Sequence, residues 1–117
     1  EIASCLVGSE MCIRDRGEVI LAKLQPSDIV ILLDERGKEF TSREFAMWME
    51  KQMASGRKRI VFVIGGPYGF SQAIYDRASS LVSMSKMTFN HEMIRLFFVE
   101  QMYRAMTILR GEPYHHD

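Results

Sequence analysis

Cysteine, proline and long apolar runs are scarce in this chain of 117 residues, and each scarcity excludes a class of protein. Its 2 cysteines are Cys5 and Cys12, so the rest of the chain has no thiol for a disulfide, a zinc site or a nucleophile. With 3 prolines and 8 glycines, the composition is not that of a disordered or collagen-like chain. The apolar runs at 29–33 and 60–64 are too short to span a bilayer, so we expect no membrane association.

A bias toward one sign of charge is absent as well. The chain has 15 Lys and Arg against 15 Asp and Glu, which excludes a strongly basic nucleic-acid wrapper and a polybasic membrane anchor. Any RNA contact must therefore come from local patches. A domain of this size buries only about two thirds of its unfolded surface, which makes a second copy of the chain a useful source of burial. The scarcity of cysteine and the lack of a targeting segment favour the cytoplasm.

The first sixteen residues do not share the pattern of the rest. Residues 6–15 read LVGSEMCIRD and resemble the in-frame translation of a transposase adapter end used in DNA sequencing libraries. We interpret residues 1–16 as an adapter-derived artefact and residues 17–117 as the domain proper. Setting the first segment aside removes both cysteines, two arginines and three acidic residues, and it leaves a net charge of about +1.

Strand and helix patterns alternate along residues 17–117. The runs at 29–33 and 60–64 lack polar alternation, which is typical of strands buried on both faces. Thr41 and Glu44 have the spacing of a capping box at a helix start. The pattern predicts an α/β fold whose mostly parallel sheet is covered by helices on both faces. The expected elements are a helix end at 18–24, a strand at 29–33, a polar loop at 34–38, a helix from 41 to 56, a strand at 60–64, a short helix at 71–78, a strand at 81–85 and a helix at 91–109.

Three expected strands run into loops of unusual composition, at residues 33–37, 65–69 and 85–90. Ligands of open parallel sheets bind beyond the carboxyl ends of the strands, so we expect a binding crevice there. The glycines of 65–69 would let a flat ligand approach the backbone, although a tight strand-to-helix turn needs glycine equally. The loop matches neither dinucleotide nor P-loop spacing, which disfavours a phosphate cradle.

Five short motifs follow one another in a fixed order. They are LDERGK at 33–38, IGGPYG at 64–69, SKMTFNH at 85–91, EQMYRA at 100–105 and PYHH at 113–116. In this order they resemble the bacterial family of ribosomal large-subunit pseudouridine methyltransferases, which are minimal members of the SPOUT superfamily. The resemblance covers essentially all of residues 17–117.

The resemblance implies a SPOUT-type trefoil-knotted α/β domain that is a homodimer and binds S-adenosylmethionine in the knot. It also implies methylation of the N3 nitrogen of a pseudouridine in the 23S rRNA of the assembled ribosome, without a metal. The cofactor contacts that it implies fall on Leu33, Gly66, Ser85, Lys86, Met87, Thr88, Phe89 and Asn90.

Three departures from the family pattern stand out. The family begins with a further strand and helix before Gly17, and the adapter-like segment takes their place, so we expect an N-terminally truncated member. Asn90 stands where the family usually has proline, and His116 stands where it usually has arginine or lysine.

The imide nitrogen of the target base must lose a proton, and histidine titrates nearest neutral pH. The candidate bases or orienting groups are His91, His115 and His116. His91 also suits a helix start. The resemblance implies that the tail closes over the cofactor region and that Tyr114 and His115 help to hold the target base, whereas a frayed, solvated end is the alternative.

Arg104 and Glu100 have helical i,i+4 spacing, so Arg104 is either a helix ion-pair partner or a phosphate ligand.

Two other functions compete with methylation. One is a noncatalytic RNA- or ribosome-binding module that retains the fold, and measured cofactor binding separates it from an enzyme. The other is a nucleotide-binding regulator, which the missing phosphate-loop pattern disfavours.

Overall fold

A parallel sheet of four strands organises the chain in the computed structural model, which describes residues 2–6, 13–56, 59–65 and 69–116. The strands lie in the order β1-β3-β2-β4, and every neighbouring pair is parallel. The strands are β1 (Ile2–Leu6), β2 (Ile29–Glu39), β3 (Ile60–Ile64) and β4 (Ser80–Ser83), and the helices are α1 (Ile13–Lys23), α2 (Ser42–Met53), α3 (Gln72–Arg77) and α4 (His91–Leu109).

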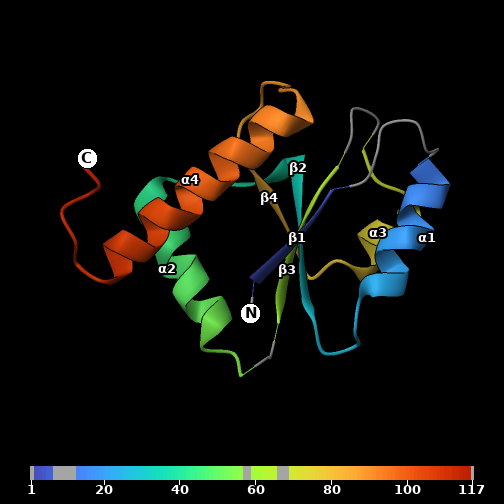
Figure 1. Cartoon of the computed structure of the whole chain (residues 1–117), viewed down its shortest axis with the longest axis horizontal. Coiled ribbons are helices and arrows are strands. Elements are labelled where there is room, and N and C mark those ends of the chain that lie inside the picture. Colours follow the sequence, from blue (N-terminus) through green and yellow to red (C-terminus); the bar gives the residue numbers. More distant parts are fainter. Residues whose placement is uncertain (1, 7–12, 57–58, 66–68, 117) are drawn as a thin grey trace.

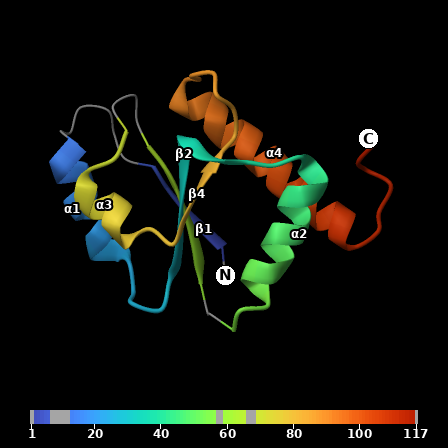
Figure 2. The same ribbon diagram turned by 180° about the vertical axis from the view of Figure 1, so that it is seen from behind.

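The helices cover both faces of the sheet, with α1 and α3 on one side and α2 and α4 on the other (Figures 1 and 2). Successive strand residues point to opposite faces. Ile29, Ile31 and Leu33 accordingly pack in the core beneath α2 and α4, while Val30 and Leu32 pack in the core beneath α1 and α3. Because both faces of β2 and β3 pack in an apolar core, neither strand alternates between apolar and polar residues over 29–33 and 60–64. The expected α/β class is confirmed.

Strand β2 is longer than its apolar run predicts. Residues 34–38, expected as a polar loop, continue the strand to Glu39, with a register shift against β4 between Leu33 and Lys38. Glycine makes this extension possible, because a Cβ at Gly37 would stand 2.6 Å from the backbone of Leu81 and Val82. Polar residues therefore follow the core strand without ending the sheet.

The expected helices are confirmed, with one boundary that differs. The Thr41 hydroxyl accepts from the Glu44 N–H at 3.1 Å and the Glu44 carboxylate accepts from the Thr41 N–H at 2.8 Å, so the capping box opens α2. Ser71 caps α3. Helix α1 starts at Ile13, ahead of the helix end expected at 18–24.

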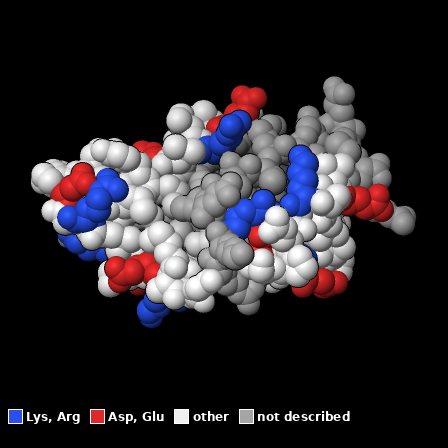
Figure 3. Space-filling model, turned by 60° about the horizontal axis from the view of Figure 1, so that its bottom comes forward, with Lys and Arg blue, Asp and Glu red and all other residues white. Residues whose placement is uncertain are grey.

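Basic and acidic side chains lie interspersed on the face shown in Figure 3, in keeping with their equal counts. Within the described residues, no helix is both long and apolar enough to cross a membrane.

Candidate functional site

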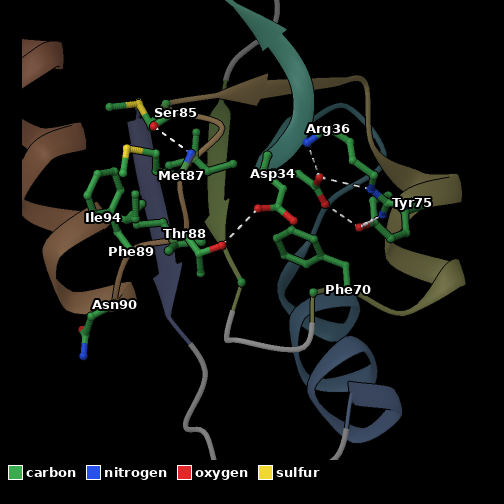
Figure 4. Close-up of a pocket in the computed structure, with 16 residues that line it drawn as sticks. Asp34, Arg36, Phe70, Tyr75, Ser85, Met87, Thr88, Phe89, Asn90 and Ile94 are labelled. Atoms are coloured by element: carbon green, nitrogen blue, oxygen red, sulfur yellow. Dashed lines mark hydrogen bonds and ion pairs between the residues drawn. The ribbon is translucent and has the colours of Figure 1, made fainter.

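A cavity of about 630 Å³ opens beyond the carboxyl ends of β3 and β4 and beside residues 33–36 of β2 (Figure 4). This volume is in the usual range for small-molecule sites. Residues 33–36 of β2 and the stretches that follow β3 and β4 line the cavity, which lies where the sequence predicts a binding crevice. The lining residues are Leu33, Asp34, Glu35, Arg36, Ile64, Gly65, Gly69, Phe70, Tyr75, Met84, Ser85, Met87, Thr88, Phe89, Asn90 and Ile94.

Most of the residues expected to contact a cofactor line this cavity together. Two do not join them. Gly66 lies outside the described residues. Lys86 is absent from the lining, and its exposed ammonium pairs with Glu39 at 3.7 Å. The expected contact residues that line the cavity are Leu33, Ser85, Met87, Thr88, Phe89 and Asn90.

Local hydrogen bonds shape the stretch between β4 and α4. The Ser83 hydroxyl donates to the Ser85 carbonyl at 3.0 Å, and the Ser85 hydroxyl accepts from the Met87 N–H at 3.0 Å. The Asn90 side-chain oxygen accepts from the Glu92 N–H at 2.8 Å and so caps α4. Asparagine, among the preferred helix caps, thus supplies a hydrogen bond that proline in this position could not make.

A cluster of Asp34, Arg36 and Tyr75 forms one wall of the cavity, and sequence analysis did not single it out (Figure 4). The Asp34 carboxylate accepts from the Arg36 N–H at 2.8 Å and from Arg36 Nε at 3.4 Å. The Tyr75 hydroxyl donates to Asp34 and accepts from the Arg36 guanidinium. That guanidinium also lies over the Tyr75 ring, 4.8 Å from its centre. Tyr75 comes from α3, so only the fold brings it to the other two.

The environment fixes the charge states of this cluster. Burial alone raises the pKa of Asp34, but hydrogen bonds from Tyr75 and Arg36 outweigh it, so the pKa lies below its usual value. Burial, together with the hydrogen bond to Asp34, raises the pKa of Tyr75. The hydrogen bond to Asp34 likewise raises the pKa of Arg36. At neutral pH the cluster is therefore a carboxylate, a phenol and a guanidinium.

Glu35 and Thr88 approach each other across the cavity. The Thr88 hydroxyl donates to the Glu35 carboxylate over 3.4 Å, and this contact joins β2 to the stretch after β4 (Figure 4). It leaves the apolar side chains of Met87, Phe89 and Ile94 on one side and the Asp34 cluster on the other.

The candidate catalytic residues of the tail lie elsewhere in the same chain. Tyr114 donates to Glu100 at 3.3 Å and packs edge-on against Tyr103, with ring centres 4.8 Å apart. Arg104 donates to Nδ1 of His115 at 3.0 Å and to Glu100 at 2.6 Å. Neither tail residue lines the cavity, and the tail follows the far end of α4 (Figure 1). The closure of the tail over the cofactor region, expected from the sequence, is therefore not formed within one chain.

The remaining candidates are placed as follows. His91 is the first residue of α4 and directly follows Asn90 of the cavity wall, while His116 is exposed at the end of the tail. Arg104 forms the i,i+4 ion pair with Glu100, which is one of its two expected roles. No group of three or more potential ligands for a metal ion occurs among the described residues.

A second cavity, of about 430 Å³, adjoins the first. Met84 and Phe89 line both cavities, and Glu100 and Arg104 line the second. Glu100 and Arg104 are the partners of Tyr114 and His115. The tail is therefore connected to the wall of the second cavity but not to that of the first.

A parallel α/β sheet with a cavity at the carboxyl ends of its strands characterises this chain, and comparison with known families agrees with that arrangement. The family model described as "Predicted SPOUT methyltransferase" matches residues 7–115. The chain belongs to this family.

Its relatives include several bacterial proteins named ribosomal RNA large subunit methyltransferase H. The one from Bacteroides fragilis is 66% identical over 101 residues, the one from Parabacteroides distasonis 63% and the one from Porphyromonas gingivalis 59%. Each match covers 86% of this chain and 64% of the relative. The chain thus spans a little under two thirds of the length of these relatives.

Proposed function

We propose that the chain transfers a methyl group from S-adenosylmethionine to the N3 nitrogen of a pseudouridine in 23S rRNA of the assembled ribosome, in the cytoplasm. The observation that supports this most directly is the cavity, which gathers six of the eight expected cofactor residues at the carboxyl ends of the strands. The names of the relatives support rRNA of the large subunit as the substrate.

The cavity suits the proposed cofactor in two respects. Leu33, Ile64 and Phe89 offer apolar surface for a flat ring, and the carboxylates of Asp34 and Glu35 suit a cation. S-adenosylmethionine, when bound, supplies an electrophilic methyl group on a cationic sulfonium. The role of this chain is to hold the acceptor nitrogen in line with that methyl group, since positioning lowers the barrier of such a transfer.

Removal of the imide proton falls to His115 or His91 in this proposal, and Tyr114 helps to hold the target base. His91 stands beside the cavity wall in the sequence, whereas the tail of the same chain packs on α4. We propose that the chain acts as a homodimer and that the tail of a second copy brings Tyr114 and His115 to the cavity. A knotted path of the chain remains a prediction from the family.

The domain division stays a proposal as well. Residues 17–117 carry all five family motifs, and residues 1–16 include the ten residues that resemble an adapter translation. We propose that the first segment has no part in cofactor or RNA binding.

Calorimetry with S-adenosylmethionine tests the proposed function on the full chain. We expect binding, and we expect Met87→Arg to weaken it at least tenfold, because the new cation stands at the cavity wall and opposes the cationic ligand. Met47→Arg is the matched control. It places the same charge on another exposed methionine, on α2 and outside both cavities, and should leave the affinity unchanged.

Absence of binding by a folded chain would contradict the enzyme and favour the noncatalytic module. That module would bind ribosomes equally with and without S-adenosylmethionine, and it would transfer no labelled methyl group to them.

A further inference from the structure

Of the wall formed by Asp34, Arg36 and Tyr75, only the Asp34 carboxylate has a part in the proposed cofactor site. The cofactor contacts expected from the sequence lie at Leu33, at Gly66 and after β4, and the cluster stands across the cavity from Thr88 (Figure 4). Its members also differ in exposure. The Asp34 side chain is 7% exposed, whereas that of Arg36 is 68% exposed. The cluster therefore presents a cation to solvent at the cavity edge and keeps the matching anion behind it.

The Arg36 guanidinium is fixed in place, but only some of its hydrogen-bond donors have partners among the described residues. A guanidinium carries five N–H donors. Among the described residues, Nε donates to Asp34 and Nη2 donates to Tyr75, which accounts for two of the five. Stacking over the Tyr75 ring fixes its plane. A planar donor that is fixed in place and retains free N–H groups suits an oxyanion with two acceptor oxygens.

We infer that Arg36 binds a backbone phosphate of the RNA substrate at the cavity edge, and that Asp34 and Tyr75 are positioning residues for it. This inference rests on the proposed function, which supplies the RNA. The exposure of Arg36 favours an RNA phosphate over the cofactor carboxylate as its ligand. An RNA strand stays largely outside the cavity and can reach a side chain at the exposed edge. The carboxylates of Asp34 and Glu35 also stand between Arg36 and the Thr88 side, and they repel an anion of a ligand seated there.

Fluorescence anisotropy with a labelled single-stranded RNA of about twelve nucleotides tests the inference, with a salt titration for each variant of the full chain. We expect Arg36→Gln to weaken RNA binding about tenfold and to lower the slope of log affinity against log salt by about 0.7, the value for one lost single-strand phosphate contact. Arg36→Lys keeps the charge and should restore the slope but only part of the affinity. Calorimetry should show S-adenosylmethionine affinity unchanged in both.

Two further variants separate positioning from charge. Tyr75→Phe removes the hydroxyl that accepts from Arg36 but keeps the ring, so RNA affinity should fall a few-fold with the salt slope unchanged. Lys51→Gln removes one exposed cation from the last turn of α2, and it should alter neither measurement.

The possible results are distinct. If Arg36→Gln weakens S-adenosylmethionine binding and leaves RNA binding intact, Arg36 binds the carboxylate of the cofactor and the inference is wrong. If neither affinity changes, the cluster only joins α3 to β2, and the inference is again wrong. In both cases the unaltered chain still binds cofactor and RNA, so the proposed function stands. An unaltered chain that binds neither overturns the proposed function and this inference together.

Discussion

At the scale of single residues, the close approach of β2 to β4 depends on Gly37. A Cβ at this position would lie 2.6 Å from backbone atoms of Leu81 and Val82, and a backbone cannot swing aside as a side chain can. We expect Gly37→Ala to cost about 3 kcal/mol of unfolding free energy, the upper end for an overpacked site. It should also weaken S-adenosylmethionine binding, because β2 and β4 carry two walls of the cavity.

Gly56→Ala is the control for this substitution. Gly56 has a φ of +81°, and a Cβ there would meet no atom within 4 Å, so alanine is strained at this position but clashes with nothing. Its cost should be about 1 kcal/mol, with cofactor affinity intact. Urea unfolding and calorimetry measure both effects. An equal loss of unfolding free energy in the two variants would contradict this prediction, because it would show that β2 and β4 move apart easily at Gly37.

Residue identity predicts local contacts better than distant ones. Thr41 and Glu44 are three positions apart, and their capping box was predicted and is confirmed. Tyr75 is 41 positions from Asp34, and no spacing rule connects a tyrosine of a short helix to a carboxylate of β2. Only the packing of α3 beside β2 brings the two together, so this wall of the cavity was not predictable from the sequence.

At the scale of elements, one ion pair ties together the amino ends of β2 and β3. Asp28 is fully buried and accepts from Arg59 Nε at 3.0 Å and from Nη2 at 2.6 Å. Arg59 also donates to the Lys23 carbonyl at 2.9 Å, which ties in the end of α1. The hydrogen bond from Arg59 is the main reason that the pKa of Asp28 lies below its usual value, and it outweighs the opposing effect of burial.

We expect Arg59→Met to cost about 3–5 kcal/mol of unfolding free energy at pH 7, because it leaves the Asp28 carboxylate buried without its partner. The pKa of Asp28 is lower in the folded chain than the ordinary value of about 3.9. Acid therefore protonates the unfolded chain first. The stability from this pair is complete above about pH 5 and declines as the pH falls through 4.

Urea unfolding from pH 3 to pH 7 measures this effect, and the difference between the unaltered chain and Arg59→Met should narrow toward pH 3. Arg110→Met is the matched control. It removes an arginine of an exposed ion pair with Glu112 and should cost no more than about 1 kcal/mol. A gap between the unaltered chain and Arg59→Met that stays constant over this pH range would contradict the role of Asp28.

Elements were predictable where the side chains report burial directly. The runs at 29–33 and 60–64 predicted β2 and β3, since a strand covered on both faces admits few polar residues. The same signal ended β2 too early, because pairing with β4 continues beyond the core, where polar side chains meet solvent. Backbone pairing with β4 sets the end of β2 at Glu39, and the hydrophobic pattern does not predict this pairing.

At the scale of the whole molecule, α4 leaves apolar side chains exposed on the face turned away from the sheet. Phe98 and Ala105 are buried against the core. Leu96, Val99 and Tyr103, by contrast, have exposed fractions of 61%, 59% and 53%. Their spacing of three and four residues makes one helical stripe. A contiguous apolar stripe of this kind typically marks a site of protein association.

The proposed homodimer gives this stripe a partner and predicts the effect of charging it. We expect the full chain to sediment at twice its mass of 13.5 kDa, and Leu96→Glu to sediment at the single mass, since a buried carboxylate opposes association. Met47→Glu alters an exposed methionine of α2 and should remain dimeric. In this proposal the tail acts on the cavity of the second copy. Leu96→Glu should therefore still bind S-adenosylmethionine but methylate ribosomes at least a hundredfold more slowly. A Leu96→Glu monomer that methylates at the full rate would show that one chain completes its own site.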